Sequence, residues 1–256
     1  MPRVLPTTTV HNFRDYGGYA VQGGGRVRRG ALYRSAELSQ ASAADQTLIA
    51  GLNLATIIDL RSMVERQAAP SQPGPGFVGE IVACEAYAEV RAPHERAAQE
   101  GGDAAQVRAW LHKAFGKIPF QPVMVPVFRL YFTALATRPG ASLVHCMAGK
   151  DRTGIAVALL QAALGVHRDD ITADFLLTNT AGDTAARYAA QAPRIRQSLG
   201  GNTPEDAVIA VLSVESDYLD AMFAAIEERG GLAAYFHKTL GITPQQLEAL
   251  RRNLIV

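Results

Sequence analysis

The chain has 256 residues, of which 48% are hydrophobic, so it is long enough for one large globular domain with a sizeable core. Its 25 lysines and arginines against 24 aspartates and glutamates give a formal charge of +1, which excludes a whole-protein attraction to nucleic acid or an anionic membrane. Any anion site must therefore be local. Two cysteines, Cys84 and Cys146, are too few for a disulfide framework or a structural zinc site, and a reducing compartment fits best.

The sequence shows no feature of export or membrane insertion. Residues 1–10 lack an apolar run of signal-peptide length, and nowhere do about 18 uncharged apolar residues follow one another. We therefore expect a cytoplasmic protein with no stable membrane insertion, although export without a signal peptide would leave the same sequence. The six histidines show no ligand spacing for zinc, so we expect neither a metal nor a cofactor.

The first 60 residues are predicted to form two short strands, a helix and a buried strand that ends near Asp59. Glycines within residues 16–33 indicate two short strands joined by a turn. A helix is predicted over 42–51, because Ser42 is a good N-cap and apolar residues follow it. The short β-branched run at 54–60 predicts a buried parallel strand, which places Asp59 at its carboxyl end.

The next stretch has the composition of an insertion. Residues 68–79 are rich in proline and glycine, and alanine and charged residues dominate the segment that follows. We expect about 84–125 to form a mobile loop or helical lid within a single domain spanning 1–256. Trp110 and Phe115 stand at helical spacing in this segment, so they could cover a pocket or form a satellite apolar cluster.

The second half alternates one strand with helices. A helix is predicted over about 126–136, and the apolar run at 142–145 predicts a second buried strand. An apolar helix is predicted over 153–164, and helical patterns continue to residue 254. The predicted fold class is therefore α/β, with a central, mainly parallel sheet flanked by helices.

The segment from His145 to Gly154, HCMAGKDRTG, joins the second predicted strand to a helix. A strand-to-helix turn can aim successive backbone N–H groups into one concavity, and the helix N-terminus adds positive potential, so the turn can bind a phosphate dianion. Gly149 lets the backbone turn and approach the anion closely. We therefore predict a phosphate-binding group made of Met147, Ala148, Gly149, Lys150 and Thr153.

The side chains of this loop suit nucleophilic catalysis. The positive field favours the thiolate of Cys146, which is the nucleophilic form of cysteine. The guanidinium of Arg152 can offer a planar fork to two phosphate oxygens, which lysine cannot do. The Thr153 hydroxyl can donate to the thiolate when a cysteinyl phosphate breaks down. Loop amides and Arg152 would carry the phosphate charge without a metal.

Four other interpretations compete with a catalytic phosphate-binding loop. Cys146 alone could be a small buried apolar residue, but the surrounding glycines and cations disfavour that interpretation. A nucleotide-binding P-loop fails, because Val144 stands where its first glycine is needed. A phosphate-reading module without turnover and a sulfurtransferase of rhodanese type are the remaining rivals. A rhodanese loop need not contain the Arg-Thr-Gly helix start seen here.

Several motifs resemble the protein tyrosine phosphatase superfamily, in particular its bacterial atypical members with tyrosine and lipid phosphatase activity. The Gly-Lys-Asp-Arg form of the loop carries this resemblance. Residues 12–18 (NFRDYGG) resemble the N-terminal signature of the family, and residues 29–35 resemble the strand that follows it. Residues 59–62 with Glu65 resemble its Asp-Leu-Arg motif, and 214–219 resemble its C-terminal region.

The resemblance implies a cysteine-dependent phosphomonoester hydrolase. It implies Cys146 as nucleophile, Arg152 as phosphate clamp, and Lys150 and Asp151 as active-site residues. The implied substrates are proteins carrying phosphotyrosine, phosphoserine or phosphothreonine, and phosphoinositides, with phosphate as product. Lys150 would suit a multiply phosphorylated headgroup. Residues 68–125 are the part that the resemblance covers least.

The general acid is the point where the sequence departs from the family pattern. A leaving oxygen needs a proton, normally from an aspartate on a separate loop before the nucleophile, yet no aspartate or glutamate occurs between Asp103 and Asp151. Asp151 could be the acid, or it could only cap the following helix. Asp59 could be the acid, or it could be a structural partner of Arg34 or Arg61. We favour Asp151.

Three further residues are open to more than one interpretation. Cys84 could be a resolving thiol for an oxidised Cys146, or a core residue. Arg14 and Asp15 could line the pocket, or a turn-stabilising ion pair could explain them. His145 is expected to orient the loop by hydrogen bonding.

Overall fold

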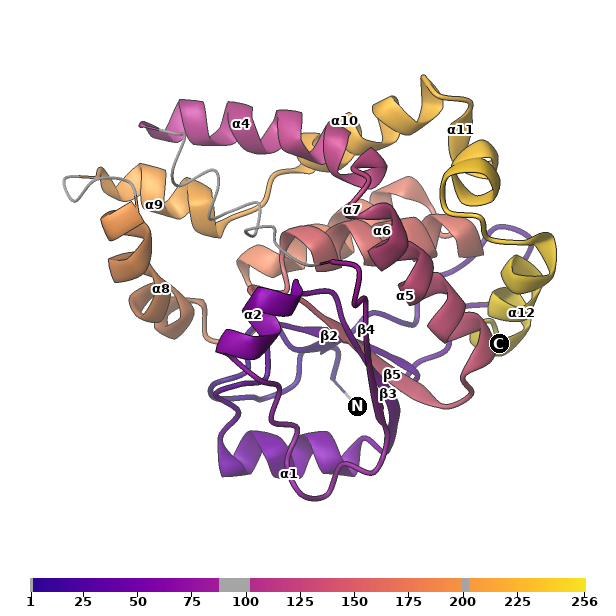
Figure 1. Ribbon diagram of the computed structural model, residues 1–256, viewed down its shortest axis with the longest axis horizontal. Helices are drawn as coiled ribbons and strands as arrows, with labels where there is room; N and C mark the ends of the chain where they lie inside the picture. Colours follow the sequence, from indigo (N-terminus) through magenta and orange to yellow (C-terminus); the bar gives the residue numbers. More distant parts are fainter. Residues whose placement is uncertain (1, 88–101, 199–202) are drawn as a thin grey trace.

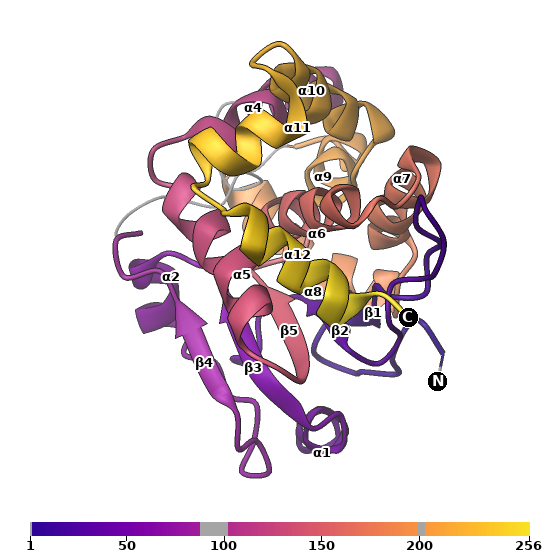
Figure 2. The same ribbon diagram turned by 90° about the vertical axis from the view of Figure 1, so that its right-hand side faces the viewer.

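A five-stranded sheet carries the loop. The computed structural model describes residues 2–87, 102–198 and 203–256 (Figure 1), and its sheet has the order β1-β2-β5-β3-β4 (Figure 2). β1 is antiparallel to β2, and the other neighbouring strands are parallel. The mainly parallel sheet predicted from sequence is confirmed. Its strands are β1 (Arg14–Asp15), β2 (Leu32–Ser35), β3 (Leu54–Asp59), β4 (Glu80–Ala83) and β5 (Ala141–His145).

Helices cover both faces of this sheet, α1 on one face and α5 and α6 on the other (Figure 2). Two 3₁₀ turns, Ile118–Phe120 and Leu177–Asn179, and a π-helical turn, Tyr235–Thr239, complete the described elements. The helices are α1 (Ala43–Gly51), α2 (Met63–Ala68), α4 (Ala104–Lys117), α5 (Val125–Thr137), α6 (Asp151–Leu164), α7 (Arg168–Leu176), α8 (Thr184–Ser198), α9 (Glu205–Leu212), α10 (Ser216–Glu227), α11 (Gly231–Ala234) and α12 (Pro244–Leu254).

The strand register explains why the central strands are apolar on both sides. Tyr33, Leu143 and Ile57 are register partners, and all three belong to the smaller core beside α1. One residue further on, Val144 and Ile58 are register partners that enter the larger core on the opposite face. Because successive side chains of a strand point to opposite faces, a sheet buried on both sides requires such continuous apolar runs.

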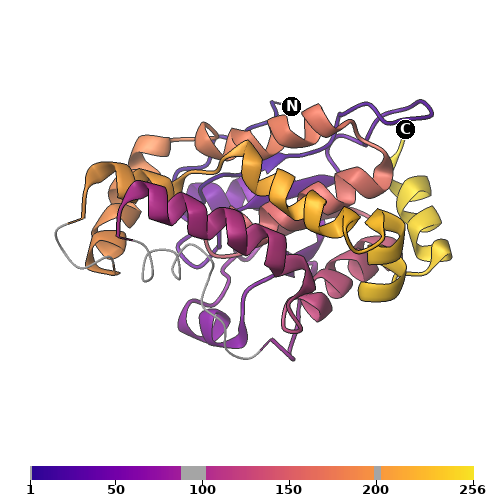
Figure 3. The same cartoon turned by 90° about the horizontal axis from the view of Figure 1, so that it is seen from above.

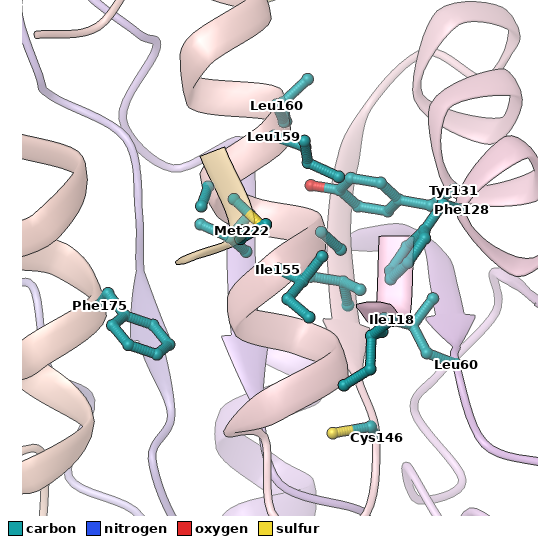
Figure 4. Packing of buried hydrophobic residues seen from close by; sticks show 14 of the residues in the cluster. Leu60, Ile118, Phe128, Tyr131, Cys146, Ile155, Leu159, Leu160, Phe175 and Met222 are labelled. Atoms are coloured by element: carbon teal, nitrogen blue, oxygen red, sulfur yellow. The ribbon is translucent and has the colours of Figure 1, made fainter. Parts of the chain in front are cut away.

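Helix α6 runs through the larger core. Its residues from Asp151 to Gln161 are all buried, and Ile155 and Leu159 pack among side chains from neighbouring helices (Figure 4). Figure 4 also shows Cys146 beyond the Ile155 end of this helix. A Cβ at Gly154 would lie 2.6 Å from the Phe175 ring, so only glycine allows α7 to pack this closely against the first turn of α6. The helix start is thus fixed by packing.

The segment expected to form a lid is helical where it is described. Helix α4 lies beside α10 (Figure 3) and also contacts α9. Leu111 and Phe115 are buried in the larger core, and Trp110 packs against the same core instead of forming a satellite cluster. Residues 88–101 of the expected lid lie outside the described residues, so the lid stays a prediction.

Within the described part of the chain, no single helix is long and apolar enough to cross a membrane. One pair of segments, residues 104–120 and 125–137, meets that criterion only when its two members are taken together, and they are bent by 65° at their junction.

Candidate active site

The loop after β5 is a bowl whose carbonyl groups are held on its outer side. The His145 carbonyl accepts a hydrogen bond from the Leu60 amide at 2.9 Å, and the Met147 carbonyl accepts one from the Glu37 amide at 3.0 Å. In a planar trans peptide the C=O and the following N–H point in opposite directions. The Cys146 amide therefore points away from Leu60, and the Ala148 amide points away from Glu37.

Gly149 makes the turn of this bowl possible. Its φ of +64° lies in the left-handed region, and a Cβ would stand 2.3 Å from the Ser35 carbonyl oxygen. Cys146 precedes this turn with 2% of the residue exposed, and it lies beyond the N-terminal end of α6 (Figure 4). The expected combination of strand end, turn and helix start is therefore present.

Arg152 is held by a two-pronged ion pair. Its Nη1 lies 2.6 Å from Glu65 Oε2 and its Nη2 lies 2.7 Å from Glu65 Oε1. Burial disfavours the charged guanidinium, yet the hydrogen bonds that it donates to Glu65 hold the pKa of Arg152 well above its usual value. The hydroxyl of Tyr87 lies 3.3 Å from Arg152 Nη1 and adds a third contact. The guanidinium is thus pre-oriented.

Glu65 obtains its place from the start of α2. Ser62 and Glu65 form a capping box, in which the Ser62 Oγ accepts from the Glu65 amide at 3.3 Å and Glu65 Oε2 accepts from the Ser62 amide at 2.7 Å. Burial opposes ionisation of Glu65, but its hydrogen bonds with Arg152 hold its pKa below the usual value. No pattern in the sequence places Glu65 at Arg152, although the Ser-x-x-Glu spacing of residues 62–65 is typical of this cap.

We expect Glu65→Gln to lower kcat/KM by about 10- to 100-fold, since a charge-assisted pair that orients the phosphate clamp is lost. Steady-state kinetics on para-nitrophenyl phosphate measure this effect. Ser62→Ala is the matched control: it removes the same cap without removing the carboxylate, so it should cost about 1 kcal/mol of stability and little activity. Equal losses of activity in the two variants would contradict a specific role of Glu65.

Asp59 forms an ion pair with Arg61. Its carboxylate accepts two hydrogen bonds from Arg61 Nε, at 3.0 and 3.1 Å, and a third from Arg61 Nη2 at 2.7 Å. Burial opposes its ionisation, but His145 and Arg61 together lower the pKa of Asp59 to about 2. These contacts support the structural interpretation of Asp59 as a partner of Arg61, and its role as catalytic acid stays a prediction.

His145 connects this ion pair to the loop. Its Nε2 lies 3.6 Å from Asp59 Oδ2, and its Nδ1 donates to the Cys146 carbonyl at 3.2 Å. Burial lowers the pKa of His145, and Asp59 opposes this shift. The contact has the orienting geometry that the sequence suggested.

The side chain of Lys150, which the family resemblance implies as an active-site residue, is bound to backbone carbonyl groups. Its Nζ donates to the Val211 carbonyl at 2.6 Å and to the Ser213 carbonyl at 3.2 Å, at the C-terminal end of α9. Unpaired carbonyls at a helix end attract cations, so they compete for this ammonium group. Burial lowers the pKa of Lys150. In this structure Lys150 therefore contributes its backbone to the bowl, while its side chain fastens the loop to α9.

Asp151 and Thr153 lie in the first turn of α6. Both are buried, and Asp151 Oδ1 stands 3.4 Å from Lys150 Nζ. The Thr153 hydroxyl has no hydrogen-bond partner within the described residues. A buried hydroxyl without a partner is uncommon in proteins, and a thiolate or leaving group beside it would supply one.

Cys84 is poorly placed to form a disulfide with Cys146. The two cysteines directly follow β4 and β5, and β3 lies between these strands. Two strand spacings separate them by about 9–10 Å. A disulfide needs Cα atoms less than about 7 Å apart, so the core interpretation of Cys84 is favoured.

Metal binding finds no support in the side chains. In residues 2–87, 102–198 and 203–256, no group of three or more histidine, cysteine, aspartate or glutamate side chains is arranged to hold a metal ion. The positive charge beside the loop comes instead from Arg152, Lys150 and the helix N-terminus.

A parallel sheet whose central strand ends at a cysteine, followed by an amide-lined turn and an arginine in the next helix, defines a cysteine-dependent phosphatase. The family model described as tyrosine phosphatase family matches residues 5–256. The chain belongs to the tyrosine phosphatase family, and it is a phosphatase-type hydrolase.

Curated relatives agree over nearly the whole chain. A Cupriavidus necator protein with a provisional tyrosine-protein phosphatase name is 34% identical over 95% of this chain and 86% of its own length. The triple specificity protein phosphatase PtpB of Mycobacterium tuberculosis is 29% identical over 95% of this chain and 96% of its own length. A tyrosine-protein phosphatase of Nostoc commune is 25% identical over 88% of this chain and 74% of its own length.

Proposed function

We propose that Cys146 is the nucleophile of a two-step phosphomonoester hydrolysis. The Cys146 thiolate attacks phosphorus, forming an S–P bond while the bond to the leaving oxygen breaks, and Asp151 gives that oxygen its proton. Water then attacks the phosphocysteine, Asp151 takes a proton from the water, and the S–P bond breaks to release phosphate. The Thr153 hydroxyl donates to the departing thiolate.

The observation that carries this proposal is the bowl itself. The His145 and Met147 carbonyls are held by groups outside the loop, so the Cys146 and Ala148 amides point away from those groups and are available to a phosphate beside the buried Cys146. Arg152 is fixed by Glu65 at the start of the adjoining helix, ready to contact the equatorial oxygens. Preorganised donors of this kind stabilise a transferring phosphoryl group without further rearrangement.

The proposed substrates are phosphoproteins and phosphoinositides. The breadth is supported by the name of PtpB, a triple specificity phosphatase. The Lys150 side chain adds less support than expected, because it is bound to carbonyls of α9. Arg187 is a second candidate cation. It is buried in α8, where its Nη1 donates to the Thr178 carbonyl at 2.7 Å, and it lines a small pocket with Ala148 and Lys150 and a neighbouring cavity of about 410 Å³.

The test is a side-by-side measurement of kcat/KM on phosphotyrosine peptides, phosphoserine peptides and phosphoinositides. We expect turnover of all three classes. Arg187→Met should lower kcat/KM on a bisphosphorylated phosphoinositide by about tenfold and leave the phosphotyrosine peptide within about twofold, because only the former offers a second phosphate. Arg196→Met, on the same helix but paired with Glu205, is the control. Turnover of peptides alone would restrict the enzyme to phosphoproteins.

A further inference from the structure

The Gly149 carbonyl is held by two side chains from the N-terminal part of the chain. Asn12 Nδ2 donates to it at 2.8 Å and Arg34 Nη2 donates to it at 3.0 Å. Both residues are buried, with 1% and 0% of their surface exposed. The outer carbonyl of Met147 is held by a backbone amide, whereas Gly149 is held by an amide side chain and a cation.

These contacts fix the direction of the next amide. The Gly149 carbonyl and the Lys150 N–H belong to one planar peptide and point in opposite directions. Since Asn12 and Arg34 hold the carbonyl on the outer side, the Lys150 N–H is aimed to the inner side, where phosphate binds. A charged donor on the carbonyl also polarises the peptide, which strengthens its N–H as a donor.

A buried ion-pair group keeps both donors in place. Asp174 Oδ2 lies 3.0 Å from Arg34 Nη1, and Asp174 Oδ1 lies 3.6 Å from Arg14 Nε. Arg14 Nη2 also donates to the Asp174 carbonyl at 2.9 Å, and its Nη1 donates to Asn12 Oδ1. The group thus contains two guanidinium cations and one carboxylate anion behind the phosphate loop.

The charge balance of this group favours an anion in the bowl. Burial and the neighbouring charge of Arg34 lower the pKa of Arg14 to about 9, so the Arg14 guanidinium is charged at neutral pH. Tyr19, whose hydroxyl lies 3.4 Å from Asp174 Oδ1, is neutral there because burial raises its pKa. One uncompensated positive charge therefore remains behind the loop.

The backbone at Asn12 fits this role. Its φ is +59°, a left-handed conformation that asparagine adopts more readily than most residues. This conformation lets the short side chain bridge Arg14 and Gly149. Asn12, which lies outside the phosphate loop, therefore contacts Arg14 through its Oδ1 and the Gly149 carbonyl through its Nδ2.

We propose that Asn12 and Arg34 are positioning residues of the phosphate loop, which aim the Lys150 amide at the bound phosphate, and that Arg14 and Asp174 hold them there. The inference rests on the proposed function of the loop, but it concerns phosphate binding and not turnover. It assigns a purpose to part of the NFRDYGG segment that lies far from Cys146 in the sequence.

The test measures inhibition by inorganic phosphate in Asn12→Asp and Arg34→Met. Asn12→Asp has the same size, tolerates a positive φ and keeps the acceptor for Arg14, but it no longer donates to Gly149. We expect phosphate to bind about tenfold more weakly to each variant, because each variant loses one of the two side-chain donors that hold the Gly149 carbonyl. Arg34→Lys, which keeps the charge, should recover part of this loss.

A second measurement addresses the amide itself. In ¹⁵N-labelled protein titrated with inorganic phosphate, the Lys150 amide resonance should shift strongly in the wild type and much less in the variants. Thr178→Val is the matched control, since it removes a 3.3 Å contact of Arg14 without touching Gly149. It should lower the melting temperature and leave phosphate binding unchanged.

Two outcomes separate the inference from the proposed function. Variants that lose stability as Thr178→Val does, yet bind phosphate and shift the Lys150 resonance as the wild type does, would overturn the positioning role. A wild type that binds phosphate with the expected Lys150 shift but hydrolyses no phosphomonoester would overturn the proposed function and leave the positioning role standing.

Discussion

Replacing Cys146 by serine lowers the turnover of para-nitrophenyl phosphate by roughly 10⁴-fold or more, because losing a covalent nucleophile removes the pathway itself. The bowl remains, since the backbone amides and Arg152 do not depend on the sulfur. The folded variant should therefore still bind inorganic phosphate. Initial rates of para-nitrophenyl phosphate hydrolysis measure the loss of turnover. Titration with inorganic phosphate measures whether the variant still binds it.

Cys84→Ser is the matched control for this experiment. Cys84 is half-buried and follows a different strand, so its replacement should leave turnover within about twofold. Activity in the wild type should persist with a metal chelator present, because the described donors of positive charge are amides, arginine and lysine. Equal activity of Cys146→Ser and the wild type would remove the phosphocysteine from the mechanism.

The parts of the fold that follow from local pattern were predicted correctly. The apolar runs at 54–60 and 142–145 are adjacent parallel strands, and the predicted helices at 42–51 and 126–136 are α1 and α5. Periodicity and capping residues carry these signals within a few neighbouring positions, so one sequence is enough to read them. The phosphate-binding turn was also recognisable, because all its parts are contiguous from His145 to Gly154.

The partners of the loop could not be predicted, because they come from distant segments. Glu65 reaches Arg152 across 87 positions, and Arg34 reaches Gly149 across 115. The direction of the Lys150 side chain depends on where the C-terminal end of α9 packs, which no pattern near the loop specifies. The candidate reacting groups can therefore be proposed from the sequence, whereas the residues that contact them are visible only in the structure.

The role of Asp151 can be tested by the leaving group. If its carboxyl group protonates the departing oxygen, Asp151→Asn should lower kcat by roughly 10²- to 10⁴-fold on alkyl phosphates, whose leaving groups need a proton. The loss on para-nitrophenyl phosphate should be smaller, since that phenolate leaves more easily. Parallel kinetics on the two substrates measure this difference, and pH profiles should lose their dependence on a protonated acid in the variant.

Asp59→Asn is the control that separates a proton donor from an ion-pair partner. Asp59 is bound to Arg61 and its pKa is about 2, so its stabilising charge is present above its unfolded pKa of about 4 and is lost as the pH falls through about 2. Its replacement should reduce stability at neutral pH, with equal relative rates on both leaving groups. If Asp151→Asn instead hydrolyses alkyl and aryl phosphates at wild-type rates, Asp151 serves only as a cap of α6 and the leaving oxygen must obtain its proton from another group.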